Sequence, residues 1–446
     1  MGSEKDVMTI GIIGCGYVFD HYMATWARHP GLTIAGVADR DTARRDIVAA
    51  AYNLRAYPNN EAMLADPDIH IIVNLTNIES HYEITRAALA AGKHVYSEKP
   101  LVTDLEEARA LFALAEERNL RLSCAPSNAL SDTSQTMWKA VRDGAVGDVR
   151  IVYAEFDDNV IYRMYPETWT SRTGAPWPYL NEYEQGCTYE HVGYHLTWLC
   201  AIFGPVESVT AFSKVALPDK TDQPLNPPDT PDFSVACLNF ASGVVARVTC
   251  SIGVPYDHRM RIIGNLGMLT ADTYRDYQCP VYLERFSQLT LNARKARSVR
   301  TNSVLQWAIG VGGRRLKLVR NPTPGAGGRD TRPGLRWWSP GDILRALKRT
   351  QLGQQDKTIG IAELNDAIAN NRPSFPPHDF TLHLTELTIA IQSAGKSGRG
   401  TSLETTFAPL APCPETLANG QDYSVVARPS WWLRIIEARL IRMHRH

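Results

Sequence analysis

The stretch MTIGIIGCGYVFDHYMATWARHPGLTIAGVADR, residues 8–40, decides the fold of the first part of the chain. Its apolar start, Met8–Ile13, predicts a β-strand, and a glycine turn follows at Gly14-Cys15-Gly16. The next residues, Tyr17–His29, predict a helix, and a second apolar run, Leu32–Ala38, predicts a strand that ends on an aspartate. A strand, a glycine turn, a helix, a strand and an acid in this order are typical of a dinucleotide-binding unit.

The residue types in this unit suit cofactor binding. Gly14 permits a tight turn, Gly16 lets a pyrophosphate approach the backbone, and the helix N-terminus offers free N–H groups. Asp39 can accept hydrogen bonds from both ribose hydroxyls and would repel a 2′-phosphate, so we expect NAD rather than NADP, although Arg40 softens this preference. Phe19 replaces the usual third glycine, so we expect the helix to pack differently. The cofactor-binding candidates here are Gly14, Cys15, Gly16, Tyr17, Val18, Asp39 and Arg40.

Length and composition narrow the class of protein. The chain has 446 residues, which is enough for about two or three domains. Its 47 basic and 47 acidic residues balance, so no overall charge favours nucleic acid. The 8 cysteines form no CxxC pair, which favours free thiols in a reducing compartment. Since the start MGSEKD has no hydrophobic signal region and no apolar run has membrane-spanning length, we expect a cytoplasmic protein.

Strand and helix patterns alternate up to about residue 125. Apolar runs at Ile69–Leu75, His94–Ser97 and Arg121–Ala125 predict further strands, and the segments between them predict helices. Repeated units of this kind form a doubly wound parallel sheet, in which ligands bind at the carboxyl ends of the strands. The residues at these ends, which we expect to line one crevice, are Gly14, Asp39, Thr76, Glu98 and Ala125.

The pattern changes after about residue 128. Strand patterns between residues 206 and 285 follow one another with short turns, which predicts a mostly antiparallel open sheet with one prominent helix before it, at 188–202. Later helices, Ile359–Ala369 and Phe380–Ala394, are expected to belong to the same domain. We therefore predict a dinucleotide-binding domain at 1–128, a substrate and oligomerisation domain of α/β type at 129–428 with an insert at about 290–350, and a C-terminal helix at 429–446.

Three motifs carry a resemblance to a known family. They are the Gly14-Cys15-Gly16 turn, Glu98-Lys99-Pro100 after a predicted strand, and GCTYEHVGYH at residues 186–195. Together they resemble the Gfo/Idh/MocA oxidoreductases, which include glucose–fructose oxidoreductase and inositol dehydrogenase, over nearly the whole chain apart from the insert and the tail. The resemblance implies a Rossmann domain, an open-sheet second domain, a homo-oligomer, and NAD-dependent hydride transfer at a secondary hydroxyl or keto carbon of a sugar, sugar nucleotide or cyclitol.

The resemblance also indicates the catalytic residues. It places Lys99 beside the nicotinamide and the reacting hydroxyl, where an ammonium can stabilise developing alkoxide charge. The family's helix motif has Asp and, four residues later, His, and these positions hold His191 and His195 here. A neutral histidine can take a hydroxyl proton near neutral pH, so we expect His195 to act with Lys99, and His191 to orient the site or to take over the proton transfer. Glu190 lies about 100° from His191 on a helix and should point elsewhere.

Several loop residues are further candidates for contacts with cofactor and substrate. Thr76, Asn77 and His81 match the family's loop on the nicotinamide side, and Asn128 lies where the chain crosses between domains. An aromatic and arginine-rich loop at 162–172 suits a sugar ring with phosphate or carboxylate groups. The spacing of His191 and His195 would also suit a metal, but no third ligand stands out and we expect none. The remaining cofactor and substrate candidates are Glu98, Lys99, Tyr165, Trp169 and Arg172.

Two basic segments lie outside these motifs. Residues 291–350 hold 14 lysines and arginines against two acids, with tryptophans interleaved, and the tail after residue 429 predicts a basic amphipathic helix. Such segments contact a membrane surface or a partner, or they pack on the second domain or an oligomer interface. Because neither segment contains a recognised nucleic-acid-binding motif, we expect no nucleic-acid binding.

Three other functions remain open from the sequence. One is a redox-neutral glycosidase or lyase that uses tightly bound NAD, and a second is an imine or enamine reductase. The third is a non-catalytic NAD-binding sensor or scaffold with the basic segments as its docking surface.

Overall fold

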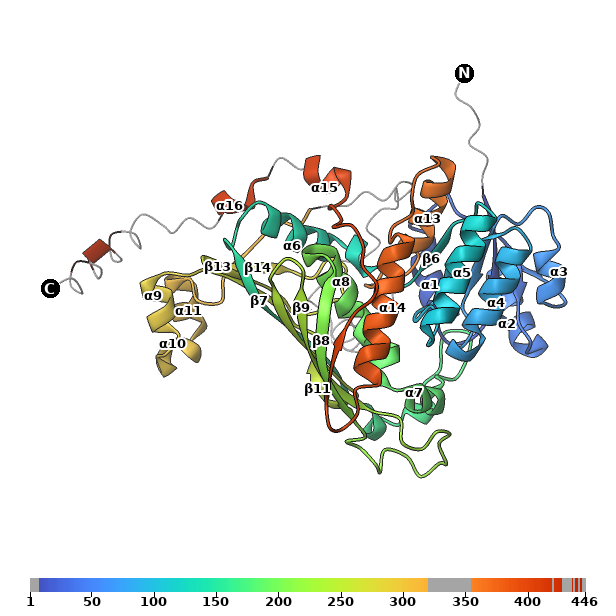
Figure 1. The fold of residues 1–446 in the computed structure, drawn as a ribbon, viewed down its shortest axis with the longest axis horizontal. Coiled ribbons are helices and arrows are strands. Elements are labelled where there is room, and N and C mark those ends of the chain that lie inside the picture. Colours follow the sequence, from blue (N-terminus) through green and yellow to red (C-terminus); the bar gives the residue numbers. More distant parts are fainter. Residues whose placement is uncertain are drawn as a thin grey trace, which may run out of the picture.

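A computed structural model of the protein describes residues 8–319, 354–418 and 421–426, together with Ile435, Ala438, Arg439 and Arg442. In this structure a parallel sheet and a larger, mostly antiparallel sheet form two domains that lie side by side (Figure 1). The doubly wound first domain and the open-sheet second domain predicted from the sequence are thereby confirmed.

The first sheet has six parallel strands in the order β3-β2-β1-β4-β5-β6. Its strands are β1 (Thr9–Ile13), β2 (Thr33–Ala38), β3 (Arg55–Ala56), β4 (Ile71–Asn74), β5 (His94–Ser97) and β6 (Leu122–Cys124). The helices between them are α1 (Phe19–Trp26), α2 (Thr42–Tyr52), α3 (Asn60–Leu64), α4 (Ile78–Ala90) and α5 (Leu105–Glu117).

Local chemistry explains where these helices begin. The Asp41 carboxylate accepts hydrogen bonds from the first backbone N–H groups of α2, at 3.0 and 3.1 Å, and Asp104 caps α5 in the same way at 3.0 Å. The sequence did not predict α3, which Asn59 caps by accepting from the Ala62 backbone N–H at 2.8 Å. The helix expected at Tyr17–His29 is shorter, because α1 covers only Phe19–Trp26.

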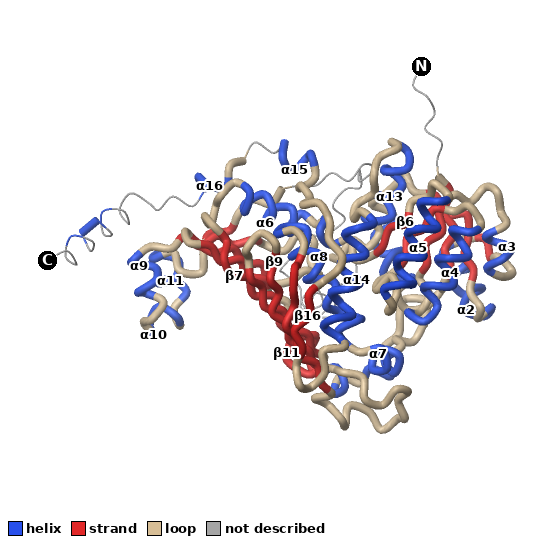
Figure 2. The backbone as a smooth tube through the Cα atoms, viewed as in Figure 1, coloured by secondary structure: helices blue, strands red, loops and turns tan. Residues whose placement is uncertain are grey.

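The second sheet has ten strands, shown as the long red layer of Figure 2. All its pairings are antiparallel except that of β7 with β10. Its strands are β7 (Val149–Val160), β8 (Val206–Lys214), β9 (Phe233–Phe240), β10 (Val245–Ser251), β11 (Gly253–Asp257), β12 (Met260–Gly264), β13 (Gly267–Ala271), β14 (Val281–Arg285), β15 (Arg314–Arg315) and β16 (Arg399–Ser402).

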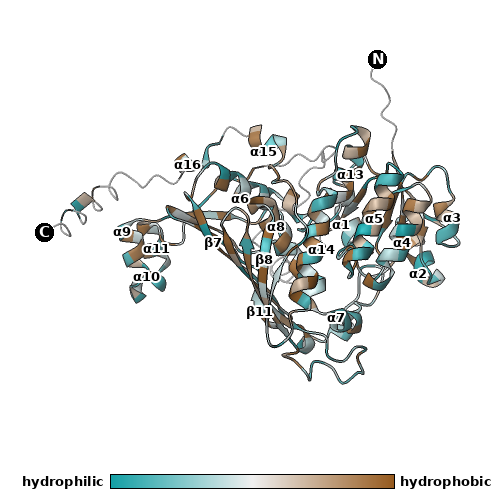
Figure 3. Ribbon diagram, viewed as in Figure 1, coloured by the Kyte–Doolittle hydropathy of each residue, from teal (hydrophilic) through white to brown (hydrophobic). Residues whose placement is uncertain are grey.

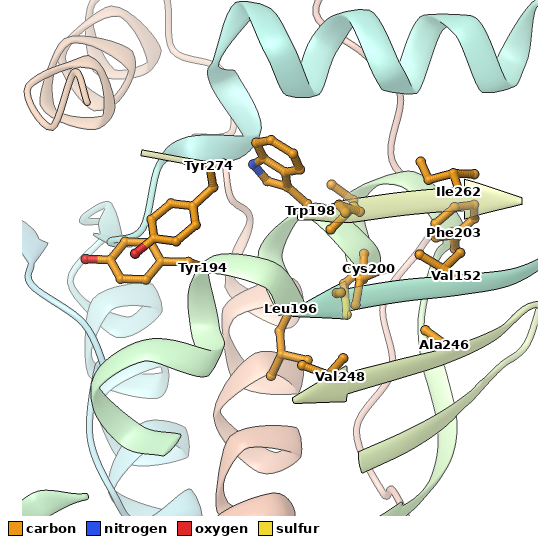
Figure 4. Packing of buried hydrophobic residues seen from close by; sticks show 14 of the residues in the cluster. Val152, Tyr194, Leu196, Trp198, Cys200, Phe203, Ala246, Val248, Ile262 and Tyr274 are labelled. Atoms are coloured by element: carbon orange, nitrogen blue, oxygen red, sulfur yellow. The ribbon is translucent and has the colours of Figure 1, made fainter. Parts of the chain in front are cut away.

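One helix forms the centre of the second domain's core. The helix α8 (Gly193–Phe203) is largely hydrophobic, as Figure 3 shows, and packs against one face of the large sheet. Figure 4 shows Trp198 and Cys200 from this helix beside Val152 and Ile262 of the strands, all of them buried. The indole N–H of Trp198 also donates to the carbonyl of Asn128 at 2.9 Å, which ties the core to the crossing between the domains. The helix α6 (Asp132–Arg142) covers the same core.

Two helices from late in the chain return to the first domain. The sequence assigned α13 (Ile359–Ala369) to the second domain, but its apolar side chains pack in the core of the first sheet, beside Tyr96 and Val37. The helix α14 (His378–Gln392) lies between the domains, since Leu382 packs on the first-domain core and Phe380 belongs to the second-domain core (Figure 1). The expected assignment to the second domain is wrong for α13, which is apolar on more than one side, whereas most buried apolar residues of α14 lie in the second-domain core.

The described part of the basic insert is a small helical lobe, residues 288–309, at the far end of the large sheet (Figure 1). It consists of α9 (Gln288–Ala293), α10 (Arg297–Arg300) and α11 (Ser303–Ile309). Trp307 on α11 is 84% exposed. The rest of the insert and nearly all of the predicted tail helix lie outside the described residues. Among the helices that are described, including α15 (Pro414–Ala418) and α16 (Tyr423–Val426), none has the length and hydropathy needed to cross a membrane.

Candidate active site

A cleft of about 850 Å³ lies where the carboxyl ends of the first sheet face the second domain. Its lining combines the first domain's turns, loops of the second domain, and the segment just before α13. Of the sequence-predicted residues, those that line it are Gly14, Gly16, Tyr17, Val18, Asp39, Arg40, Thr76, Asn77, His81, Glu98, Lys99, Trp169 and His191. The predicted residues outside the lining are Cys15, Ala125, Asn128, Tyr165, Arg172 and His195.

The two glycines of the first turn have different structural roles. Gly14 has φ +105°, and a Cβ there would lie 2.5 Å from the carbonyl carbon of Leu75, so the turn itself requires glycine. At Gly16 a Cβ would meet no protein atom within 4 Å, yet this residue lines the cleft. The open space over the Gly16 backbone therefore fits a group that approaches closely from the cleft, as a dinucleotide's pyrophosphate does.

Asp39 is held in place at the end of β2. Its carboxylate accepts the backbone N–H of Cys15 at 2.6 Å and that of Asp41 at 2.8 Å. Cys15 thus contributes its backbone to this corner, while its side chain is fully buried and burial holds the pKa of its thiol at about 12. Phe19, in place of the third glycine, is buried against Tyr52 with 5.6 Å between the ring centroids. The fixed carboxylate suits hydrogen bonding to ribose hydroxyls.

A strap from the second domain, residues 169–178, covers the nucleotide end of the cleft. Its Thr173 backbone N–H donates to Asp20 of α1 at 2.7 Å, and its carbonyl accepts from Arg44 of α2 at 2.9 Å. Arg44 also donates to the carbonyl of Cys15, at 3.1 Å, within the glycine turn. Inside the strap, Trp169 lies beside Trp177 with ring centroids 4.9 Å apart, and both line the cleft. The strap therefore connects both domains at the glycine turn.

Two residues expected to contact substrate lie outside the cleft. Tyr165 is 71% exposed and turns away because its backbone adopts a left-handed conformation, with φ +55°. Arg172 lies over the ring of Tyr52, 5.6 Å from its centroid, on the first domain's surface. The sequence placed both in one aromatic loop, but of the three substrate candidates in this loop only Trp169 lines the cleft.

The loop after β4 is fixed by His81. One ring nitrogen of His81 lies 2.7 Å from the Pro100 carbonyl, and the other lies 3.1 Å from the Thr76 carbonyl. Burial lowers the pKa of this histidine. The Thr76 hydroxyl in turn donates to Asn74 at 2.7 Å. These contacts place the loop with Thr76 and Asn77 next to the turn that carries Lys99.

Lys99 lies at the inner end of the cleft and is paired with Glu190. Its ammonium donates to Oε2 of Glu190 at 2.5 Å. Burial favours the neutral amine, but the carboxylates of Glu190 and Glu98, with Tyr194, outweigh this and raise the pKa of Lys99 above its ordinary value. The ammonium form is therefore held in place beside the cleft.

The position of Glu190 corrects the expectation that it points elsewhere. Residues Thr188–Val192 form a π-helix, which continues into α8. A π-helix has a wider turn than an α-helix, so the rotation of 100° per residue used for the prediction does not apply. As a result Glu190 and His191, although adjacent, both line the cleft.

Glu98 connects Lys99 to a residue far along the chain. Its carboxylate accepts from Lys357 at 2.8 Å, from the Tyr22 hydroxyl at 2.9 Å, and from the Lys99 backbone N–H at 3.0 Å. Burial alone would raise the pKa of Glu98, but the nearby charges of Lys357 and Lys99 lower it to about 2. Glu98 is therefore an ionised, buried anchor under the turn that carries Lys99.

His191 faces the cleft, whereas His195 does not. The Nε2 atom of His191 contacts Oε1 of Glu182, and its ring stacks on Phe156 with 4.7 Å between centroids. His195 is 1% exposed, and its Nε2 lies 3.3 Å from the His258 carbonyl. Because the π-helix ends between them, the two histidines do not share one face of a regular helix. Burial lowers the pKa of His195 to about 4, so it is a neutral core residue.

Asn128 is another predicted residue that the fold uses internally. It is fully buried, and its amide donates to the Tyr194 carbonyl at 2.8 Å.

Among the residues that the structure describes, no group of three His, Cys, Asp or Glu side chains could hold a metal ion.

Several cleft residues were missed by the sequence reasoning. Arg275 follows β13 and donates to Asp158 of β7 at 2.5 Å. Lys357 precedes α13, and Glu182 lies on a helix that was not predicted, α7 (Tyr179–Gln185). These residues meet at the cleft through contacts between distant parts of the chain, and no local motif marks them.

Comparison with known families agrees with this geometry. Residues 8–125 match the model of the Gfo/Idh/MocA oxidoreductase family with its NAD-binding Rossmann fold, and residues 134–270 match the Gfo/Idh/MocA C-terminal domain. An uncharacterized oxidoreductase of Synechocystis is 25% identical over 285 residues, which are 60% of this chain and 73% of that relative. The UDP-N-acetylglucosamine 3-dehydrogenase of Acidithiobacillus ferrooxidans is 38% identical over 116 residues, 26% of this chain and 36% of the relative.

Solved structures show the same fold along most of the chain. A levoglucosan dehydrogenase, in complex with NADH and levoglucosan, superposes with a TM-score of 0.66 at 18% identity, covering 89% of this chain and 99% of the other. The two matched domain models, the parallel and open sheets, and the glycine turn over the cleft lead to one assignment. The chain belongs to the Gfo/Idh/MocA family of oxidoreductases and has an NAD-binding Rossmann domain.

Proposed function

We propose that this enzyme transfers hydride between NAD and a secondary hydroxyl or keto carbon of a sugar or sugar nucleotide. One observation carries the proposal: the Lys99 ammonium, held by Glu190 at 2.5 Å, lies in the same cleft as the glycine turn and Asp39. A charged donor at the inner end of a dinucleotide cleft is what a developing alkoxide requires.

The chain's own residues supply binding, orientation and charge. When bound, the nicotinamide accepts or supplies the hydride. Lys99 hydrogen-bonds the reacting oxygen and lowers the pKa of the hydroxyl, and Glu190 keeps this amine protonated. Trp169 and Trp177 provide apolar faces on which a sugar ring can pack.

The proposed substrate class is based on the relatives and is tested directly. One relative is named for UDP-N-acetylglucosamine, a nucleotide sugar, and one structural neighbour for levoglucosan, an anhydro sugar. Purified protein is mixed with NAD and each compound, and reduced nicotinamide is followed by absorbance. We expect one class to be turned over, Lys99→Met to abolish turnover, and the exposed-lysine control Lys214→Met to retain it. Turnover that persists in Lys99→Met would overturn the proposal.

The strap favours a second candidate, a redox-neutral reaction with retained NAD. Its contacts from Thr173 to Asp20 and Arg44 hold the strap across the nucleotide end of the cleft, and we expect this cover to slow cofactor exchange. Protein that keeps its nicotinamide through gel filtration, and forms product without net reduced nicotinamide, would support this candidate over the dehydrogenase.

We also propose a homo-oligomer formed through the open face of the large sheet. Ile151 of β7 and Val245 of β10 are register partners on this face, and they are 42% and 43% exposed. Neighbouring exposed apolar side chains of this kind favour burial against a second copy. Light scattering at the column outlet measures the mass, and a monomer at micromolar concentration would contradict the proposal.

A cytoplasmic location with peripheral membrane contact is a further proposal. All 8 cysteines are free, which suits a reducing compartment. The exposed Trp307 lies in a segment with six exposed basic residues, and aromatic and basic side chains together favour an anionic bilayer surface. Flotation with vesicles containing phosphatidylglycerol tests this, and equal recovery with neutral vesicles would contradict it.

A further inference from the structure

We propose that Glu182 is the group that exchanges the proton of the substrate hydroxyl in this cleft, and that His191 positions its carboxyl. The inference rests on the hydride-transfer function proposed above and names a catalytic acid–base that the sequence motifs do not contain. It replaces the assignment of this step to His195 or His191.

The contact between these two residues lies inside the cleft. Glu182 is 5% exposed and His191 is 8% exposed, and both line the cleft with Lys99. Oε1 of Glu182 forms a hydrogen bond with Nε2 of His191. Its other oxygen, Oε2, has no hydrogen-bond partner in the part of the chain that the structure describes. One oxygen is therefore anchored, and the other is available to a substrate hydroxyl.

A glycine makes this arrangement possible. Gly186 connects α7 to the π-helix with φ +92°, and a Cβ there would lie 2.6 Å from the Thr230 side chain. Only glycine fits this conformation and this space, and the sharp turn folds α7 back against the π-helix. Glu182 and His191 thus meet across the turn although they lie nine residues apart.

The ring of His191 is fixed and is unsuited to act as the base. It stacks on Phe156 with an interplanar angle of 19°, and its Nδ1 is buried without a hydrogen-bond partner among the described residues. Burial lowers the pKa of His191 to about 3, so the ring is neutral and binds a proton only weakly at neutral pH. Its role is to hold the Glu182 carboxyl by one hydrogen bond.

The carboxyl of Glu182 has the proton affinity that the step requires. Burial raises its pKa to about 7, partly offset by the Lys99 ammonium, and a general acid–base works best when its pKa lies near the operating pH. The titratable and charged groups that act on Glu182 or His191 are Lys99, Asp158, Tyr183, Glu190, Cys250, His258 and Arg275.

The step balances in both directions. In oxidation the hydroxyl proton passes to the ionised Oε2 of Glu182, the hydride leaves the carbon for oxidised nicotinamide, and the C–O bond becomes a carbonyl. In reduction the protonated Glu182 donates its proton to the oxygen as the carbon receives hydride. Lys99 hydrogen-bonds the same oxygen throughout.

The test is Glu182→Gln, which keeps the side chain's shape and removes its ionisation. We expect turnover of the active panel compound to fall by about 10²–10⁴-fold. In the unmodified enzyme we expect the oxidation rate to rise with pH through about 7, and the reduction rate to fall over the same range. Both of these pH dependences should be absent in Glu182→Gln. The matched control is Glu184→Gln on the same helix, outside the cleft, which should leave rate and pH profile unchanged.

Three measurements separate the outcomes. NADH binding and thermal unfolding show whether Glu182→Gln folds, and Glu182→Asp, which keeps the carboxyl, should retain the pH limbs at a lower rate. Infrared difference spectra against pH detect a buried carboxyl titrating near 7 without any substrate, and this band should be missing in Glu182→Gln. A folded Glu182→Gln with unchanged rate and pH profile overturns the proposal. If Lys99→Met is inactive in the same assay while Glu182→Gln is unaffected, the hydride-transfer function is still supported and only the role of Glu182 is overturned.

Discussion

The ammonium of Lys99 donates a hydrogen bond to Glu190 at 2.5 Å, across the boundary between the two domains. Lys99 follows β5 of the first sheet, and Glu190 lies on the π-helix of the second domain. The charge on the amine therefore depends on how the domains meet. This pair is one of the contacts through which the first and the second domain form the cleft.

Removing the carboxylate of Glu190 should change the pH range of activity. Glu190 opposes the effect of burial on Lys99, so in Glu190→Gln burial dominates and the pKa of Lys99 falls. The ammonium is then lost at lower pH, and the alkaline limb of turnover moves to lower pH. Rate measurements from pH 6 to pH 11 check this. An alkaline limb that stays in place would show that Glu190 does not control the amine.

The buried Glu98 should make the free energy of unfolding depend on pH in the acidic range. Its pKa is lowered from 4.5 to about 2, so its contribution is complete above pH 4.5 and is lost as the pH falls toward 2. The shift corresponds to about 3 kcal/mol at neutral pH. Urea unfolding at several pH values should show Glu98→Gln less stable at pH 7, with the difference shrinking toward pH 2. A difference independent of pH would contradict this account.

The two turn glycines allow a matched comparison. Gly14→Ala combines φ +105° with a backbone clash at 2.5 Å, and such strain costs about 1–3 kcal/mol, so the melting temperature should fall. Gly16→Ala meets no protein atom, so the fold should keep its melting temperature while the added methyl group weakens NADH binding. Calorimetric titration and thermal unfolding measure both. Unchanged NADH affinity in Gly16→Ala would place the pyrophosphate elsewhere.

Asp39 should set the preference for NAD. Asp39→Ser removes the carboxylate that would hydrogen-bond the ribose and repel a 2′-phosphate. Loss of a hydrogen bond to a charged group lowers NADH affinity by roughly tenfold or more, and NADPH affinity should rise with Arg40 adjacent. Fluorescence titrations with both nucleotides give the ratio. Asp46→Ser, on the exposed side of α2, is the control and should leave the ratio unchanged.

Local patterns sufficed for the first domain because its signals are short in range. The glycine turn, the apolar strands and the helix caps each lie within a few residues, and the parallel sheet followed from their order. The boundaries of β5, His94–Ser97, were predicted to the residue. The small helix α3 and the strand β11 were missed because they are short and carry weak periodicity.

By itself, the sequence determined the Rossmann unit, the open-sheet second domain, the glycine turn with Asp39, and Lys99 as a candidate at a strand end. The tertiary structure decided which other side chains reach the cleft. Local propensity does not predict a π-helix, and here a π-helix turns Glu190 toward the cleft. Packing of the core buries His195. Glu182 and Lys357 reach the site only because a glycine turn and a returning segment bring distant residues together, and such contacts depend on the packing of the whole chain.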